Sequence, residues 1–408
     1  MAEEHQSQAG ARRRDGPVSA RYVLPARANV SRKKALRVAV VVLALTAVAT
    51  SGCGRTPLGG LRADGATAAA DTSRPEASAA EAVRRTSCTR GPSDPASLLL
   101  IDDYSLVQGV AAADGLVFTI VENYGASPAP FSHIATLTVA TGEVTTTEIG
   151  EHFPMGLSAY SGGVLVPAGK VVVNGNAWSV YPSEVIRFVA GDHSWSLLTD
   201  PAEDASSSVG AAVGNDALQA FWLRADRGSG QQVIERWDPS GGTTQLVRSD
   251  GPMSGLQATH STLYWCGVNP DGYSAFLSIP VAGGTPGVVW HATSSSPAES
   301  VALVGHDDRD LYFIHTTDAG GPGIMAVSQA GGAPRTVVSG VRPTTFATDG
   351  THVYWWTLDD QSTLFRSPTA GGPIETVYHG RSLSAVALDE CNVYWLVGNP
   401  YEIYYRAK

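Results

Sequence analysis

The sequence lacks the patterns that several common protein classes need. It has no G-x-S-x-G and no H-E-x-x-H motif, so nothing points to a serine hydrolase elbow or a zinc protease. Its cysteines form neither a C-x-x-C pair nor a Cys/His spacing typical of structural zinc; they are Cys53, Cys88, Cys266 and Cys391. We therefore expect no cofactor and no metal.

Basic residues are also scarce. The net charge is −10, and the first 52 residues hold nine of the 28 basic residues but only three of the 38 acidic ones. The remainder is thus more acidic still, with 19 basic and 35 acidic residues. A chain of this charge is a poor partner for phosphate backbones, so we expect no nucleic acid as a ligand.

Long hydrophobic runs are missing apart from one of twelve residues, 38–49, which follows the basic cluster "SRKK". Twelve residues are short for a membrane span and suit a signal peptide. The run ends in "TSGC", which resembles the lipobox of bacterial lipoproteins and implies a lipid on Cys53. Ordinary cleavage after Ala49, giving a secreted soluble protein, and an uncleaved anchor are the alternatives.

The composition divides the chain into three parts. Residues 1–53 are interpreted as a signal peptide with a long N-terminal extension. Residues 54–87 are small and polar and predict a flexible tether. Residues 88–408 have the apolar content of a folded domain, exported in every one of these alternatives and placed at the cell envelope by the lipid anchor.

This domain contains an internal repeat. A Tyr-Trp or Tyr-Phe pair recurs at Tyr264, Tyr312, Tyr354 and Tyr394, at spacings of 48, 42 and 40 residues. "AGG" turns recur in step, beginning at Ala282, Ala330 and Ala370. A period of about 40–50 residues made of short strands is typical of a β-propeller blade.

One unit shows how four strands follow from the pattern. Residues 344–378 give four strands, labelled A to D in chain order: "TFAT", "HVYWWT", "TLFRSP" and "IETVY". An Asp-Gly turn joins A to B, and a Gly-Gly turn joins C to D. These glycines supply the positive φ that tight hairpins require. The Tyr-Trp pairs occupy one structural position, so we interpret them as packing between blades and not as ligand platforms.

The repeat predicts an all-β propeller of seven four-stranded blades, with six or eight as alternatives. Six complete units precede "LSAVALDECNVYWLVGNPYEIYYRAK", which supplies only three strands. An open edge there is unfavourable, so the apolar segment 96–103 is predicted to complete the last blade. This closure would bring Cys88 to Cys391, predicted to form a disulfide, whereas Cys266 is expected to be a buried thiol outside any bridge.

The repeats resemble the YWTD-like propellers and, more closely, the "DGxxVYW…AGGxP" repeats of exported bacterial proteins. The resemblance covers residues 250–408 well and the earlier blades weakly. It implies the propeller fold but no particular reaction. The Asp of "YWTD" is absent here, so no ligand role tied to that Asp is carried over.

Candidate binding residues lie on the face that carries the B–C loops and the D–A connections. The B–C loops of the first two blades, 122–132 and 169–183, are the longest, and long loops on a rigid scaffold commonly bind ligands. The aromatic candidates on these loops are Tyr124, Phe131, Trp178 and Tyr181. The polar candidates on the D–A connections are His152, Glu299, Arg342 and His379.

We therefore expect a non-enzymatic binding module that recognises a protein or a glycan through this face, with the lipid anchor as its contact with the membrane. A propeller-type lyase or hydrolase for carbohydrate or lactone is the first alternative, because a His with a Glu on the channel rim could abstract a proton. A structural subunit of an envelope complex is the other.

Overall fold

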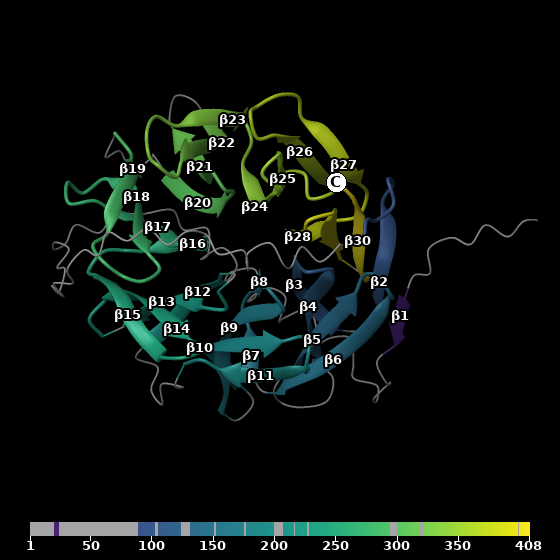
Figure 1. Cartoon of the computed structure of the whole chain (residues 1–408). Helices are drawn as coiled ribbons and strands as arrows, with labels where there is room; N and C mark the ends of the chain where they lie inside the picture. Colours follow the sequence, from purple (N-terminus) through teal and green to yellow (C-terminus); the bar gives the residue numbers. More distant parts are fainter. Residues whose placement is uncertain are drawn as a thin grey trace, which may run out of the picture.

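The computed structural model is an all-β ring (Figure 1). It describes residues 20–23, 89–102, 105–123, 131–150, 152–174, 177–199, 207–215, 217–226, 228–293, 300–317, 321–398 and 400–408. Cys53, Cys88, Tyr124 and Glu299 lie outside this set. Within it there is no helix, and so none that is long and apolar enough to cross a membrane.

Seven antiparallel sheets form the blades, in agreement with the predicted seven-bladed β-propeller. Blade 1 holds β3 (Ser105–Ala113), β4 (Leu116–Asn123), β5 (Phe131–Thr138) and β6 (Glu143–Gly150). Blade 2 holds β7 (His152–Pro154), β8 (Ser158–Tyr160), β9 (Gly163–Asn174), β10 (Ala177–Val189) and β11 (Ser194–Leu197). Blade 3 holds β12 (Ser207–Gly214), β13 (Ala220–Asp226), β14 (Gln232–Asp238) and β15 (Gly242–Ser249).

The later blades carry the clearest repeats. Blade 4 holds β16 (Ser254–Ala258), β17 (Thr262–Val268), β18 (Ser274–Pro280) and β19 (Gly287–His291). Blade 5 holds β20 (Ser300–His306), β21 (Asp310–Thr317), β22 (Gly321–Ser328) and β23 (Arg335–Ser339). Blade 6 holds β24 (Pro343–Thr348), β25 (His352–Thr357), β26 (Thr363–Pro368) and β27 (Glu375–His379).

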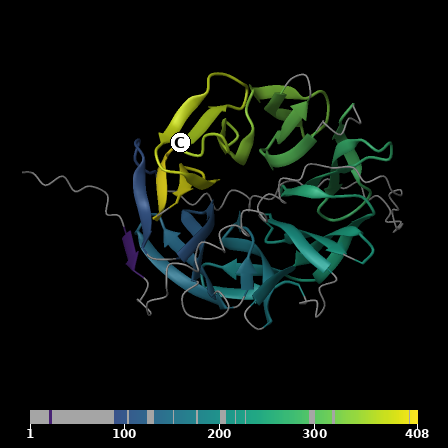
Figure 2. The same ribbon diagram turned by 180° about the vertical axis from the view of Figure 1, so that it is seen from behind.

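Blade 7 closes the ring as predicted. It contains β28 (Leu383–Leu388), β29 (Asn392–Val397) and β30 (Tyr401–Ala407) from the C-terminal end, and β2 (Ala96–Asp102) as its fourth strand. β2 runs antiparallel to β30, with Ala96 opposite Tyr405 and Ile101 opposite Tyr401. A short strand, β1 (Ala20–Val23), pairs in parallel with the outer edge of β2. The view from behind shows the same closed ring (Figure 2).

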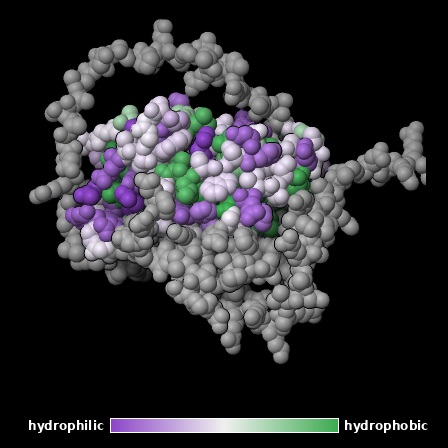
Figure 3. Space-filling view, turned by 90° about the horizontal axis from the view of Figure 1, so that it is seen from below, coloured by the Kyte–Doolittle hydropathy of each residue, from purple (hydrophilic) through white to green (hydrophobic). Residues whose placement is uncertain are grey.

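The hydrophobic core is divided among the junctions between blades. Among the described residues, each buried cluster joins two neighbouring sheets, including the seam, where Leu98 and Val107 pack with Tyr394 and Ile403. The Tyr-Trp and Tyr-Phe pairs lie in these clusters and are at most 4% exposed, as expected of residues that pack between blades. The outer wall seen from below mixes hydrophilic and hydrophobic residues (Figure 3).

The turns between strands A and B are fastened by a recurrent hydrogen-bond pattern. Asp349 accepts backbone N–H bonds from Thr351 and His352 on Oδ1 and the Tyr354 hydroxyl on Oδ2, at 3.1 Å. The pairs Tyr312–Asp307 and Tyr394–Asp389 repeat this arrangement at 2.6 Å. In blades 5, 6 and 7 an aspartate five residues before the repeat tyrosine therefore ties the turn to strand B. In blade 4 Thr259 stands at this position, and Tyr264 instead donates to Gln329.

Candidate functional site

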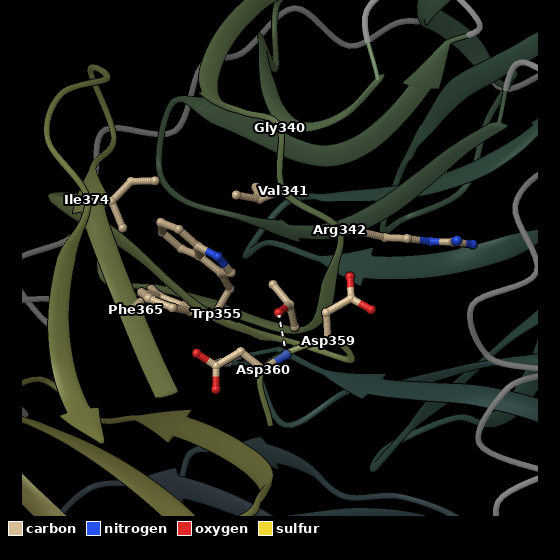
Figure 4. A pocket seen from close by; sticks show the side chains of 9 residues that line it. Gly340, Val341, Arg342, Trp355, Asp359, Asp360, Phe365 and Ile374 are labelled. Atoms are coloured by element: carbon tan, nitrogen blue, oxygen red, sulfur yellow. Dashed lines mark hydrogen bonds between the residues drawn. The ribbon is translucent and has the colours of Figure 1, made fainter. Parts of the chain in front are cut away.

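A pocket lies between blades 5 and 6, on the face that carries the D–A and B–C connections (Figure 4). Its volume is about 220 Å³. One wall is the link from β23 to β24, residues 340–342, and the other consists of side chains of blade 6. The pocket is thus built by the edges of two rigid sheets.

The interior of the pocket is aromatic and apolar. Trp355 from β25 and Phe365 from β26 stack with their ring centroids 5.9 Å apart and an interplanar angle of 29°. Val341 faces them from the link, and Ile374, which is 48% exposed, lies at the mouth (Figure 4). This lining suits a flat, weakly polar group.

The rim of the pocket is charged. Asp359 and Asp360 follow β25, and the backbone N–H of Asp360 donates to Thr357 Oγ1 at 3.2 Å. The Ser362 hydroxyl donates to Asp360 Oδ1 at 2.7 Å and lowers the pKa of that carboxyl, so it is ionised at neutral pH. Arg342 also lines the pocket, but its guanidinium points away from the two rings (Figure 4).

A second polar group lies in blade 2. His152 Nδ1 is 2.5 Å from Glu184 Oε2, with the two side chains 20% and 2% exposed. Trp195 packs edge-on against the imidazole at 5.3 Å and donates from Nε1 to the Glu148 carbonyl of blade 1. The pair therefore lies at the junction of blades 1 and 2, where it contacts β11, the last strand of blade 2.

The structure separates the other residues predicted for the site. Phe131 is the first residue of β5, and Arg342 is exposed on the link beside the pocket. His379 ends β27, with Nδ1 2.8 Å from Thr363 Oγ1. His152, Arg342 and His379, the candidates whose side chains the structure describes, belong to different blades or links: His152 to β7, Arg342 to the link after β23 and His379 to β27.

The prediction of a long loop at residues 169–183 is wrong. β9 continues to Asn174 and β10 begins at Ala177, so most of this segment is an extended antiparallel hairpin. Trp178 and Tyr181 are residues of β10, opposite Val173 and Lys170. The β-branched run Val171–Val173 was the signal for this strand.

The cysteines differ in part from the expectation. Cys266 is fully buried in β17, as predicted, but no described cysteine is a free thiol, so the prediction that it stays outside any bridge is wrong. Cys391 lies in the A–B turn of blade 7, and its predicted partner Cys88 is outside the described residues. Over the described part of the chain, no three His, Cys, Asp or Glu side chains converge as a metal site would require.

Several residues of the pocket and of the His152–Glu184 pair were not predicted as site residues from the sequence. Glu184, Asp359 and Asp360 lie on strands or short turns that look like ordinary solvated repeat positions. Trp355 was assigned to the core, which is correct, but its ring also lines the pocket.

Comparisons with known proteins support the fold. No protein-family model matches the chain, and no curated protein matches it. An acylaminoacyl peptidase from Pyrococcus horikoshii is similar with a TM-score of 0.55 and 9% identity, over 74% of this chain and 51% of that one. This chain thus spans about half the length of that peptidase.

Two further solved structures are similar over nearly their whole length. The β-propeller domain of the trilobed protease from Pyrococcus furiosus, described as having an open velcro topology, has a TM-score of 0.54 and 10% identity, over 74% of this chain and 96% of its own. An oligogalacturonate lyase solved with manganese has a TM-score of 0.50 and 12% identity, over 78% and 98%. At such identities the likeness concerns the propeller fold alone.

Proposed function

We propose that this chain is an exported, lipid-anchored β-propeller that acts as a non-enzymatic binding module at the cell envelope. The observation that carries this proposal is the pocket between blades 5 and 6. It combines an aromatic interior, an apolar mouth and a charged rim on the face that bears the connections. Such a combination on a rigid scaffold is typical of recognition sites.

The envelope location rests on the sequence. The basic cluster, the twelve-residue apolar run and Cys53 support export and lipid attachment, and the small polar residues 54–87 would let the ring reach a partner at some distance from the bilayer. Secretion as a soluble protein is the alternative. Fatty-acid labelling that is equal in the native chain and in Cys53→Ser would exclude the anchor.

Binding is tested with the full chain carrying Cys53→Ser, which separates recognition from lipid insertion. We expect it to co-sediment saturably with isolated envelopes of the cells that produce it. The control is the same chain after heat unfolding. Sedimentation that is absent, or that does not saturate, would contradict the proposal.

A lyase or hydrolase acting on carbohydrate or lactone is the second candidate, and the His152–Glu184 pair favours it. A carboxylate on Nδ1 orients an imidazole and leaves Nε2 to exchange a proton. An oligogalacturonate lyase is among the structural neighbours, so oligogalacturonates are a reasonable first substrate. Turnover by the full chain that is lost in His152→Gln would replace the binding proposal with this one.

A further inference from the structure

The outer strand of a blade presents one side chain to the following blade at a fixed position. The residue at this position of strand D pairs with a residue of strand C, and the register between the two strands shifts directly after that strand C residue. It is Trp290 opposite Phe276 in blade 4, Val338 opposite Ile324 in blade 5 and Tyr378 opposite Leu364 in blade 6. This position therefore holds an aromatic side chain in blades 4 and 6 and a small aliphatic side chain in blade 5.

Where the position is aromatic, its ring fills the junction with the next blade. Trp290 lies against Phe313 of β21, with centroids 5.2 Å apart. Tyr378 lies against Trp395 of β29 at 5.4 Å and against Tyr404 of β30 at 5.7 Å. Each of these two side chains thus covers the aromatic residue in strand B of the next blade.

The junction of blades 5 and 6 has Val338 at this position and a pocket beside it. Residues that line the pocket match those that contact the rings elsewhere. Trp355 and Phe365 pair with each other as Trp395 and Tyr404 do.

Two further lining residues complete the match. Thr357 lies two residues after Trp355. The corresponding residue in blade 5 is His315, which lies two residues after Phe313 and has its ring centroid 6.3 Å from that of Trp290. Val341 corresponds to Arg381 in the next link, and the backbone N–H of Arg381 donates to the Tyr378 hydroxyl at 3.0 Å. The pocket is therefore the space that an aromatic side chain occupies at the other two junctions.

The glycines at the two junctions agree with this interpretation. A Cβ built on Gly380 would fall 2.5 Å from the Tyr378 hydroxyl. A Cβ built on the corresponding Gly340 meets no atom within 4 Å. The space at Gly380 is filled by the blade's own tyrosine, and the space at Gly340 is open.

A valine at this position does not suffice to open a pocket. Blade 3 carries Val247 at the same place, opposite Ile234. There Met253, from the link to the next blade, joins Val247 in the cluster around Trp265 and Leu277. The junction of blades 5 and 6 combines a valine with the link residue Val341, which is shorter than methionine.

We propose that this pocket receives an aromatic side chain, tyrosine or tryptophan, from a partner polypeptide, with a basic residue beside it. The inference deepens the proposed binding function and rests on it. The aromatic class follows from the rings that fill the equivalent junctions. The basic neighbour follows from Asp359 and Asp360 at the rim, since Arg342 points away from the pocket.

The occupant does not come from the N-terminal part of this chain. The first 88 residues contain a single Phe, Tyr or Trp, which is Tyr22. That residue belongs to β1, paired with the outer edge of blade 7. The partner polypeptide of the proposal is thus the source of the ring that the experiment tests.

The test is calorimetric titration of the full chain with capped peptides. Lys-Trp-Lys should bind saturably, Lys-Ala-Lys should not, and Glu-Trp-Glu should bind more weakly than Lys-Trp-Lys. The double variant Asp359→Asn, Asp360→Asn should reduce the preference for the basic peptide by about two- to fivefold, the scale of exposed ion pairs.

The decisive variant is Val338→Tyr, which supplies the missing ring from the chain itself. It should keep or raise the melting temperature and weaken Lys-Trp-Lys binding at least tenfold. The matched control Val288→Tyr adds a tyrosine at an exposed position of the neighbouring outer strand, 49% exposed, and should bind as the native chain does. Val247→Tyr should lower the melting temperature, because Met253 already occupies that junction.

The outcomes separate this inference from the general function. Unchanged peptide binding by Val338→Tyr, or binding of an oligosaccharide but of no aromatic peptide, would overturn the inference. If the native chain sediments with envelopes yet binds no aromatic peptide, the inference fails and the binding module stands. If it binds Lys-Trp-Lys and ignores envelopes, the pocket stands and the envelope function fails.

Discussion

At the scale of single residues, the tyrosines of the repeat have a structural role that their burial defines. Tyr354 is fully buried and donates to Asp349, and Tyr312 and Tyr394 do the same with their own aspartates. Burial, followed by the charge of the nearby carboxylate, raises the pKa of Tyr354 to about 12. The pKa values of Tyr312 and Tyr394 are raised for the same reasons.

These shifts predict a loss of stability at alkaline pH. An unfolded tyrosine titrates near pH 10, and a group whose pKa is raised on folding stabilises the protein fully below its unfolded pKa. The stabilisation is therefore complete below about pH 10 and is lost as the pH rises toward about 12. Urea unfolding followed by circular dichroism should show the midpoint falling across this window.

Tyr354→Phe is the matched control, since it removes the titrating hydroxyl and keeps the ring. At neutral pH we expect it to cost about 1–3 kcal/mol, because the Asp349 carboxylate loses a buried donor. Above pH 10 the variant should lose stability less steeply than the native chain. An equal slope in both would assign the alkaline transition to other groups.

At the scale of elements, the innermost strands share an irregularity that the packing of the ring requires. The register between strands A and B shifts in β3, β12, β16, β20, β24 and β28. In β16 the shift contains Gly255, with φ of +62°. A Cβ there would lie 2.7 Å from the Leu303 carbonyl oxygen of the next blade.

Gly255→Ala should therefore be costly for two reasons. The left-handed backbone penalises a side chain by about 1–2 kcal/mol, and the clash with a backbone atom adds to that. Gly272→Ala is the matched control, since its φ is +83° but no atom lies within 4 Å of the added Cβ. Chemical denaturation should give a larger loss for Gly255→Ala, and equal losses would show that the contact with Leu303 does not matter.

The elements of the later blades could be predicted from sequence because their signals are local. β25 and β26 begin and end at the predicted residues, and β27 is displaced by one. Asp-Gly and Gly-Gly turns fix these hairpins, and the spacing repeats. In blade 2 the hairpin of β9 and β10 has no such punctuation before Asn174, and its β-branched run was interpreted as loop.

The candidate site could be predicted less well, because it depends on a difference between repeats. Val338 is an unremarkable strand residue by itself. It becomes informative only when β23 is aligned with β19 and β27, where Trp290 and Tyr378 stand. The His152–Glu184 pair joins two strands across β9, and no sequence spacing reveals that contact.

At the scale of the whole molecule, the seam between the two ends of the domain holds the ring closed. Beyond the β2–β30 ladder, Gly91 donates to Asn392 Oδ1 at 2.6 Å and Asn392 donates back to the Thr89 carbonyl at 2.9 Å. Ala407 donates to the Pro92 carbonyl at 2.8 Å. The segment that precedes β2 is thus fastened to the A–B turn of blade 7.

Deleting residues 88–103 should destabilise the chain far more than deleting residues 54–87. The first deletion exposes the β30 edge and removes Leu98 from the seam cluster, and it should cost on the order of 5 kcal/mol or prevent folding. The second removes a tether with no predicted core. Thermal unfolding followed by circular dichroism compares the two, and similar melting temperatures would mean that β2 is dispensable.

The predicted bridge between Cys88 and Cys391 belongs to the same seam. Thr89, the residue after Cys88, bonds to Asn392, the residue after Cys391. A bridge there would close a loop of roughly 300 residues, for which chain entropy gives about 5 kcal/mol. Cys391→Ser should lower the melting temperature, and a reductant should lower it less in this variant than in the native chain. Peptide mapping identifies the partner directly: a link from Cys391 to any cysteine other than Cys88, or an unchanged melting temperature in Cys391→Ser, would refute a covalent lock at the point where the ring closes.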